Sequence, residues 1–170
     1  MALSPIKYPP RLDLARTPTP LQFLSRASDK WGAGKRLWMK RDDLTGAALT
    51  GNKIRKLEFI AAHALEQGFQ TLVTCGGVQS NHCRATALVA AQLGLDCHLV
   101  LRADDEPEQN TGNFLLDQLA GATVEILPAK EWAAQLKIIY ERLESEFAEA
   151  GRPALMIPTG GSDSLGVWGY

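Results

Sequence analysis

Residues 71–94 read TLVTCGGVQSNHCRATALVAAQLG, and this stretch decides the fold. Its first residues, Thr71 to Cys75, are apolar or β-branched, which predicts a buried strand. Two glycines then interrupt the pattern, and residues 80–93 form an alanine-rich segment that predicts a helix ending at Gly94. A buried strand followed by a glycine-containing loop and a helix is the repeating unit of an α/β fold.

The same alternation continues on both sides of this stretch. Before it, residues 52–67 predict a helix, with Asn52 as a candidate N-cap and Gly68 as the residue that ends it. After it, the sequence predicts strands at residues 97–101, 123–127 and 154–157 and helices at residues 109–119 and 131–150. The strands are too apolar for either face to meet water. We therefore predict an open, mostly parallel four-stranded sheet with helices on both faces.

The two ends of the chain have a different character. Residues 1–35 contain several prolines and are predicted to be irregular, followed by a short strand near residues 37–40 and a polar loop to residue 52. The last ten residues contain Ser162, a candidate cap for a new helix, followed by apolar side chains such as Trp168. We therefore expect a truncated chain whose final helix is cut short.

Composition narrows the classes of function. The 170 residues carry 18 Lys and Arg against 19 Asp and Glu, so no basic excess points to nucleic acid or to an anionic membrane as a partner. No apolar run reaches the roughly 18 residues of a membrane-spanning helix. The 3 cysteines are too few for a disulfide framework and lack metal-ligand spacing, which favours a cytoplasmic protein without a metal site.

Two glycine-containing loops are candidate binding segments. One leads from residue 75 to Ser80, Asn81 and His82, and the other spans Pro158 to Ser162. Ligands bind beyond the carboxyl ends of parallel strands, and a helix N-terminus offers free N–H groups to a carboxylate or phosphate. The alternative is that the first loop is only a tight turn in which Ser80 or Asn81 caps the helix.

Lys53 is the candidate catalytic residue of the first predicted helix. At roughly 100° per residue, it falls inside the apolar arc formed by Leu57, Ile60 and neighbouring side chains. Burial and the positive end of the helix dipole both lower the pKa of a lysine, and only a neutral amine attacks a carbonyl to form a Schiff base. The alternative is a lysine whose stem covers the edge of the core while its amine reaches solvent.

Several motifs, taken in order, resemble one enzyme family. They are KRDDLT at residues 40–45, GNKIRKLE at residues 51–58, QSNH at residues 79–82 and GGS at residues 160–162. The set resembles the D-cysteine desulfhydrase and 1-aminocyclopropane-1-carboxylate deaminase family, whose members are pyridoxal-phosphate enzymes with a tryptophan-synthase-β-like fold. The resemblance extends from Pro18 to Tyr170, and the second and third motifs together are a specific pair.

The resemblance implies a role for each motif residue. Lys53 is similar to the lysine that holds pyridoxal 5'-phosphate through a Schiff base and moves protons. Asn81 is similar to the residue that bonds the phenolic oxygen of the cofactor, and Ser80 to a catalytic serine beside its ring. The backbone N–H groups of Ser80, Asn81 and His82 resemble a cradle for the substrate carboxylate, and Lys56 suits the cofactor phosphate. The implied reaction acts on a small amino acid and converts D-cysteine to pyruvate, ammonia and sulfide.

The resemblance also implies a division of the chain. Residues 1–51 would be an N-terminal arm of a larger, missing domain, residues 52–160 a small α/β domain with the lysine, and residues 161–170 the start of the truncated second half. Full-length relatives are typically homodimers. The alternatives are a 1-aminocyclopropane-1-carboxylate deaminase, an L-cysteate sulfo-lyase, another enzyme of the same fold such as a dehydratase or cysteine synthase, or a fragment without catalysis of its own.

Overall fold

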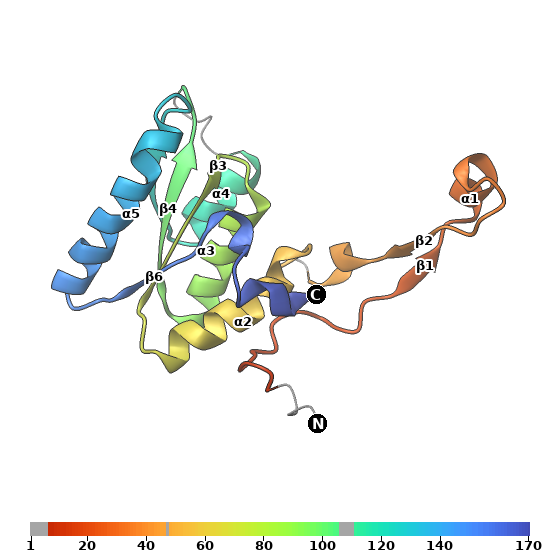
Figure 1. Cartoon of the computed structure of the whole chain (residues 1–170), viewed down its shortest axis with the longest axis horizontal. Helices are drawn as coiled ribbons and strands as arrows, with labels where there is room; N and C mark the ends of the chain where they lie inside the picture. The colour runs from red at the N-terminus through yellow and green to blue at the C-terminus, as the bar shows by residue number, and fades with distance from the viewer. Residues whose placement is uncertain (1–6, 47, 106–110) are drawn as a thin grey trace, which may run out of the picture.

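A computed structural model describes residues 7–46, 48–105 and 111–170, and its centre is a four-stranded parallel sheet (Figure 1). The strands are β3 (Thr71–Gly77), β4 (Asp96–Arg102), β5 (Thr123–Leu127) and β6 (Ala154–Met156), in the order β5-β4-β3-β6. The predicted α/β fold with a parallel four-stranded sheet is confirmed.

Helices cover both faces of this sheet. Helices α3 (Asn81–Leu93) and α4 (Gly112–Leu119) lie on one face, and α5 (Trp132–Glu149) lies on the other (Figure 1). Neighbouring residues of β3 alternate between the faces, because Leu72 packs on the α3 side whereas Val73 and Cys75 pack on the α5 side. Strand residues are therefore buried in both directions, which is typical of a parallel sheet.

Helix α2 (Lys53–Glu66) packs against α3 and binds residues 11–15. Its Glu58 carboxylate is buried and accepts backbone hydrogen bonds from Leu14 and Ala15, at 2.9 and 2.8 Å. The other carboxylate oxygen of Glu58 accepts from Arg11 Nε at 2.9 Å and from Arg11 Nη2 at 2.8 Å. The segment before the first strand is thus fixed to the helix that carries Lys53.

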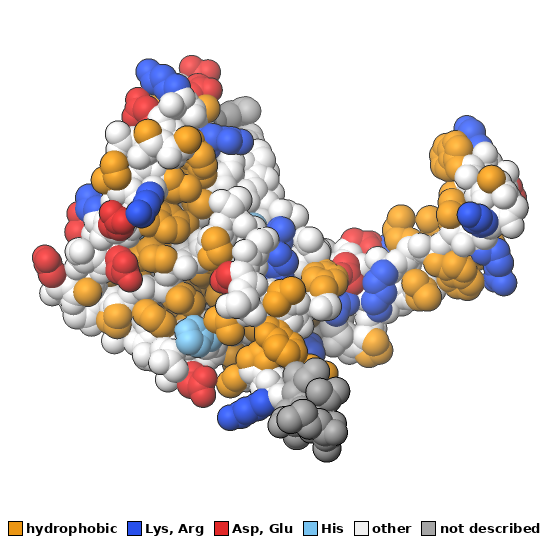
Figure 2. All heavy atoms as spheres, in the orientation of Figure 1, with side chains coloured by type: hydrophobic (Ala, Val, Ile, Leu, Met, Phe, Trp, Pro, Cys, Tyr) orange, Lys and Arg blue, Asp and Glu red, His pale blue; other side chains and the backbone are white. Residues whose placement is uncertain are grey.

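The prediction that residues 1–35 are irregular is wrong for residues 21–31. Strand β1 (Leu21–Phe23) pairs antiparallel with the predicted strand, β2 (Trp38–Lys40), and α1 (Ser25–Trp31) lies between them. This hairpin, residues 21–40, extends away from the rest of the molecule (Figure 1). Figure 2 shows apolar side chains on its surface, which include Leu21, Phe23, Trp31, Leu37, Trp38 and Met39. The prolines that suggested an irregular chain end at Pro20, directly before β1.

The boundaries of the helices follow the predicted signals only in part. Gly68 ends the α2 region with a φ of +75°, as predicted. Asn52 precedes α2, but its side chain makes no capping hydrogen bond. Among the described residues α4 begins at Gly112, and residues 109 and 110 of the predicted helix lie outside them.

The C-terminal segment forms short 3-10 helices rather than the predicted α-helical start. These are η2 (Thr159–Gly161) and η3 (Gly166–Gly169). The predicted capping role of Ser162 is wrong, because Asp163 Oδ1 accepts the N–H groups of Leu165 and Gly166, at 3.0 and 2.6 Å. Within the three described ranges, no helix combines the length and the apolar character needed to cross a membrane.

Candidate active site

The loops after β3 and β6 leave the sheet side by side. These strands are parallel neighbours, with Thr71 paired to Ala154 and Val73 paired to Met156. The chain runs from β3 to β4 and β5 on one side of β3, and it then returns through α5 to β6 on the other side. Open α/β sheets bind ligands at such a reversal of strand order. The structure thus brings the two predicted loops together at one edge of the sheet.

Lys53 begins α2 and reaches the loop after β6. A Cβ atom at Gly160 would lie 3.2 Å from Lys53 Nζ, and Gly160 has a φ of +70°. Glycine suits both the backbone conformation and the close approach. Burial, followed by repulsion from Lys56, holds the pKa of Lys53 below its usual value. The lowered pKa increases the neutral amine fraction at a given pH, and the neutral amine is the form that attacks a carbonyl.

Lys56 lies one turn further along α2 and binds the same loop. Its Nζ donates hydrogen bonds to Gly160 O at 3.3 Å and to Ser162 Oγ at 2.9 Å. A cavity of about 450 Å³ opens beside Lys56 and continues along Ser162, Asp163, Gly166, Val167 and Tyr170. This volume lies in the range of small-ligand sites. Lys56 therefore places a cation at the wall of a cavity with room for a small anionic group.

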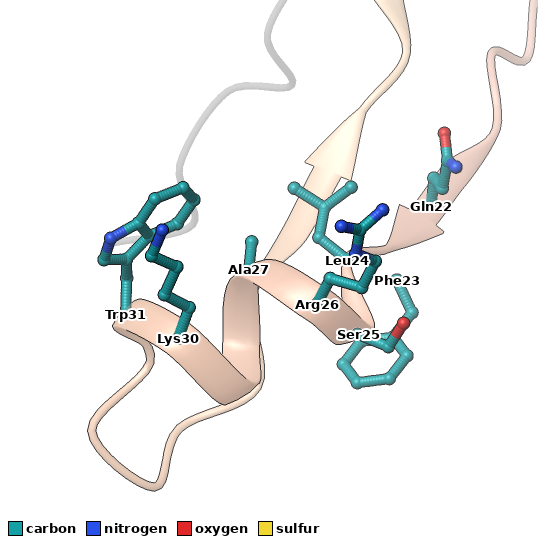
Figure 3. A pocket seen from close by; sticks show the side chains of 8 residues that line it. All are labelled: Gln22, Phe23, Leu24, Ser25, Arg26, Ala27, Lys30 and Trp31. Carbon is teal, nitrogen blue, oxygen red and sulfur yellow. The ribbon is translucent and has the colours of Figure 1, made fainter.

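A second cavity, of about 500 Å³, lies between β1 and α1 of the hairpin (Figure 3). Its walls include Phe23, Arg26, Lys30 and Trp31, and Lys30 Nζ lies 5.1 Å from the centroid of the Trp31 ring. None of the residues predicted for catalysis or cofactor binding contributes to this cavity. We therefore place the candidate active site at Lys53 and not in the hairpin.

Ser80 and Asn81 form the start of α3. Ser80 Oγ accepts a hydrogen bond from Cys83 N at 3.2 Å, so Ser80 is the N-cap, as one interpretation of the sequence proposed. Gly76 allows this turn, because a Cβ atom there would lie 2.8 Å from Ser80 Cβ. Asn81 is exposed in the first turn, where backbone N–H groups lack helical carbonyl partners. Capping and anion binding are compatible, since one serine oxygen satisfies only one of these N–H groups.

The His82 side chain has a role that the sequence analysis did not assign. The ring is buried, and its Nε2 lies 2.9 Å from Thr74 Oγ1, which donates to Ile157 O at 3.1 Å. When Thr74 donates its proton to that carbonyl, His82 Nε2 is the donor to Thr74 Oγ1. Burial, then the charges of Lys53 and Lys56, lower the pKa of His82 to about 4. His82 is therefore a neutral ring that links the start of α3 to the end of β6.

A network that the sequence analysis also missed holds the N-terminal end of α2. Arg55 donates from Nε and Nη2 to the two carboxylate oxygens of Asp42, at 3.0 and 2.8 Å, and Tyr170 OH donates to the same carboxylate. Although burial raises the pKa of Asp42, the hydrogen bonds from Arg55 and Tyr170 hold it below its ordinary value. The network fixes Arg55 two residues beyond Lys53.

The structure therefore gathers some of the predicted site residues at one turn. Lys56 binds the Gly160–Gly161 turn, and Lys53 Nζ lies beside the space that a Cβ atom at Gly160 would fill. A Cβ atom at Gly161 would lie 3.3 Å from His82 Cε1. Ser80 and Asn81 start the helix that also carries His82. The assigned roles of these residues in catalysis and binding stay predictions.

Comparisons with known proteins identify a family and several similar relatives. Residues 12–170 match the family model described as pyridoxal-phosphate dependent enzyme. A D-cysteine desulfhydrase of Serratia proteamaculans is 49% identical over 95% of this chain and 48% of its own length. The mitochondrial bifunctional D-cysteine desulfhydrase/1-aminocyclopropane-1-carboxylate deaminase of Arabidopsis thaliana is 43% identical over 92% of this chain and 40% of its own length.

A solved structure described as an ACC deaminase homologue is also similar. It has a TM-score of 0.85 and 41% sequence identity, and the match covers 95% of this chain and 48% of that chain. The chain thus spans about half the length of the relatives it matches.

Proposed function

Because the chain belongs to the family of pyridoxal-phosphate dependent enzymes, we propose that it carries the lysine-bearing site of a lyase that acts on a small amino acid. The specific proposal is a D-cysteine desulfhydrase, which releases pyruvate, ammonia and sulfide. The position of Lys53 carries the proposal, because its partly buried amine meets the Gly160 turn and has a lowered pKa. The 49% identity to a D-cysteine desulfhydrase supports this choice of substrate.

The residues around Lys53 fit the cofactor of this family. Gly160 and Gly161 leave space that a Cβ atom would fill beside Lys53 and His82. Lys53 would hold the cofactor covalently, Lys56 would bind its phosphate, and Asn81 would bind its phenolic oxygen. Bound pyridoxal phosphate supplies an electron sink for bonds at the substrate α-carbon.

The side chains of this chain supply the remaining steps. The N-terminal N–H groups of α3, at Ser80, Asn81 and His82, would bind the substrate carboxylate, because a helix N-terminus favours a negative charge. Lys53 Nζ would accept the proton of the substrate α-carbon and return it. Because His82 is neutral, it adds no repulsion to Lys53, and the lowered pKa of Lys53 comes from burial and from the charge of Lys56.

A second candidate reaction is the deamination of 1-aminocyclopropane-1-carboxylate to 2-oxobutanoate. The observation that favours it is the similarity to the structure of an ACC deaminase homologue, at 41% identity. It would use the same Lys53 amine as the proton carrier. The two reactions differ in the substrate bond that is broken, so the products distinguish them.

The division of the chain at residues 51 and 160 is also part of the proposal. The hairpin has its own two-stranded sheet, and both of its strands are exposed at every residue. Its apolar side chains would be covered by the further half of sequence that the relatives contain. Glu58 joins the N-terminal arm to the α/β domain, because it binds Leu14 and Ala15, which precede the hairpin, to α2.

Labelling of lysines with pyridoxal phosphate and borohydride tests the site. We expect one dominant adduct at Lys53, with the greatest preference over other lysines at neutral pH, because a lysine with a lowered pKa is neutral there more often. Lys53→Arg should remove the adduct, whereas Lys137→Arg, at an exposed lysine, should leave it unchanged. Lys56→Met should reduce labelling several-fold at neutral pH, since it removes the repulsion that lowers the pKa of Lys53. Label spread evenly over the surface lysines would contradict the proposed site.

Product analysis tests the substrate. With pyridoxal phosphate added, sulfide and pyruvate are measured from D-cysteine and from L-cysteine, and 2-oxobutanoate is measured from 1-aminocyclopropane-1-carboxylate. The proposal expects D-cysteine to be preferred and Lys53→Ala to abolish turnover. Turnover of 1-aminocyclopropane-1-carboxylate alone would favour the second candidate, and equal turnover by Lys53→Ala would contradict both.

A further inference from the structure

The start of α4 holds the loop that leads to Ser80. Asn113 N donates to Gln79 Oε1 at 2.7 Å, and Asn113 Nδ2 donates to Gln79 O at 2.8 Å. Gln79 Nε2 adds a longer hydrogen bond to Thr111 O, at 3.4 Å. The side chain of each residue thus binds the backbone of the other, and we call this reciprocal pair the Gln79–Asn113 clasp.

Gly112 makes the clasp possible. It has a φ of +54°, and a Cβ atom there would lie 2.3 Å from Gln79 Oε1. An alanine would therefore both strain the backbone and displace the glutamine side chain. Gly121, at the other end of α4, has a φ of +78° but open space where a Cβ atom would lie. An alanine at either glycine strains the backbone, but only an alanine at Gly112 also collides with Gln79.

Arg84 connects the clasp to the segment before Lys53. Its Nη1 donates to Asn113 Oδ1 at 3.3 Å, and its Nη2 donates to Thr50 O at 2.9 Å. Thr50 lies three residues before Lys53 in the sequence. Asn113 therefore reaches, directly or through Arg84, both segments that frame the candidate active site.

We propose that Gln79, Asn113 and Arg84 are positioning residues that fix the loop of residues 76–80 relative to Lys53. They act through the loop and do not contact the reacting atoms. This positioning role rests on the proposed function, because the loop leads directly into the proposed carboxylate cradle at residues 80–82. Small displacements of such groups have large effects on a reaction, since the reacting atoms must be aligned closely.

The first test compares Gly112→Ala with Gly121→Ala in a protein of all 170 residues of the sequence. Both variants place a side chain on a left-handed glycine, but only Gly112→Ala displaces Gln79. Amide hydrogen exchange of residues 76–83 should be roughly tenfold faster in Gly112→Ala than in Gly121→Ala, as expected for the loss of one or two hydrogen bonds. Equal exchange of this loop in the two variants would overturn the clasp.

The second test removes the clasp without changing a glycine. Gln79→Leu loses the bond between Asn113 N and Gln79 Oε1, and Asn113→Ala loses the bond from Asn113 Nδ2 to Gln79 O. Gln79→Glu keeps an acceptor for Asn113 N. The first two should speed loop exchange and slow the labelling of Lys53 by pyridoxal phosphate and borohydride several-fold. Gln79→Glu should restore much of both, and the urea midpoints should fall no further than that of Gly121→Ala. A uniform rise in exchange over the whole chain would mean a general loss of packing and would overturn the positioning role.

The two proposals fail in different ways. If the wild-type chain shows no preference for Lys53 in labelling, the proposed function fails, while a loop that depends on Gly112 and Asn113 still supports the clasp. If Lys53 is labelled selectively in the wild type and labelling is unchanged in Asn113→Ala and Gln79→Leu, the proposed function stands and the positioning role is overturned.

Discussion

Leu99 in β4 is fully buried, whereas Leu21 in β1 leaves 61% of its surface exposed, although each belongs to a hydrogen-bonded strand. The two strands represent two regions, the sheet unit of residues 53–157 and the hairpin of residues 21–40. In the sheet unit, α3 and α5 cover opposite faces of every central strand. In the hairpin, the strand pairing is intact but every residue of β1 and β2 is exposed.

Strand pairing and burial are therefore separate contributions to the stability of this chain. The hairpin is held by its backbone ladder and by surface contacts, including Phe23 against Trp38 with ring centroids 5.1 Å apart. An isolated two-stranded hairpin is marginally stable in water. The sheet unit adds apolar burial on both faces, which is the dominant favourable term in folding. The same substitution should therefore have very different effects in the two regions.

The largest expected effect comes from truncating matched leucines in the two regions. Leu99→Ala should lower the free energy of unfolding by about 2–5 kcal/mol, because it removes buried methyl groups and leaves a cavity. Leu21→Ala should change it by less than about 0.5 kcal/mol, because the side chain is largely exposed. Urea unfolding of both variants measures the contrast. A comparable loss in Leu21→Ala would mean that the hairpin is buried in solution by a partner or a second copy.

The next largest loss of stability is expected where Glu58 of α2 binds the segment before the hairpin. Glu58→Gln keeps an oxygen for the N–H groups of Leu14 and Ala15 but turns an amide toward Arg11. We expect a loss of roughly 1.5–3 kcal/mol in unfolding free energy, the range for hydrogen bonds to charged groups. Glu66→Gln, at an exposed glutamate of the same helix, should be nearly neutral. If both variants unfold at the wild-type urea concentration, the first segment of the chain does not contribute to the cooperative fold.

Much of the sheet unit could be predicted, because its signals are local. The buried runs near Thr71–Gly77 and Asp96–Arg102 are apolar on both faces, so the strands and the helices between them follow from the sequence. In the hairpin, β2 was predicted but β1 and α1 were missed, because a strand of three residues is too short to show a period and its side chains are exposed. Proline content near residue 20 then suggested an irregular segment instead.

The candidate site divides in the same way. Lys53 was identified because a lysine within an apolar arc of a helix is a local anomaly, and the glycines at residues 160 and 161 are local turn signals. The contact of Tyr170 with Asp42 joins residues 128 positions apart, and the Gln79–Asn113 clasp joins residues 34 positions apart. Side chains in polar loops give no local signal for such partners, so these contacts needed the fold.

A smaller change in stability is expected from the buried carboxyl group of Asp117 in the sheet unit. Asp117 of α4 is fully buried, and neither carboxylate oxygen has a hydrogen-bond partner among the described residues. Burial raises its pKa from 3.8 to about 7, although the charge of Arg84 opposes the rise. The folded state therefore binds the Asp117 proton more tightly than the unfolded state does. The stability that this proton provides is complete below about pH 4 and is lost as the pH rises to about 7.

Asp117→Asn should consequently be more stable than the wild type at pH 8, by roughly 1–2 kcal/mol, because it removes a buried charge but leaves a buried polar group. The advantage should shrink as the pH falls through about 7 and disappear near pH 4. Urea unfolding at several pH values measures this difference, with Asp13→Asn at an exposed aspartate as the control. An advantage that is constant with pH would mean that the Asp117 carboxyl is solvated or paired in solution.

The smallest expected effect sharpens the description of the hairpin. The guanidinium of Arg36 lies 4.9 Å from the centroid of the Phe23 ring and 5.2 Å from that of Trp38, at an exposed position. Cation–π contacts at exposed sites contribute about 0.5–1 kcal/mol. Because the hairpin adds little to the cooperative core, Arg36→Ala should leave global unfolding nearly unchanged while it shifts the fluorescence of Trp38 and speeds amide exchange in β1 and β2. Arg26→Ala, on the exposed face of α1, is the control that should leave Trp38 unchanged. A fall in global stability as large as the local change would instead place the hairpin in the same cooperative unit as the parallel sheet, because only coupled regions unfold together.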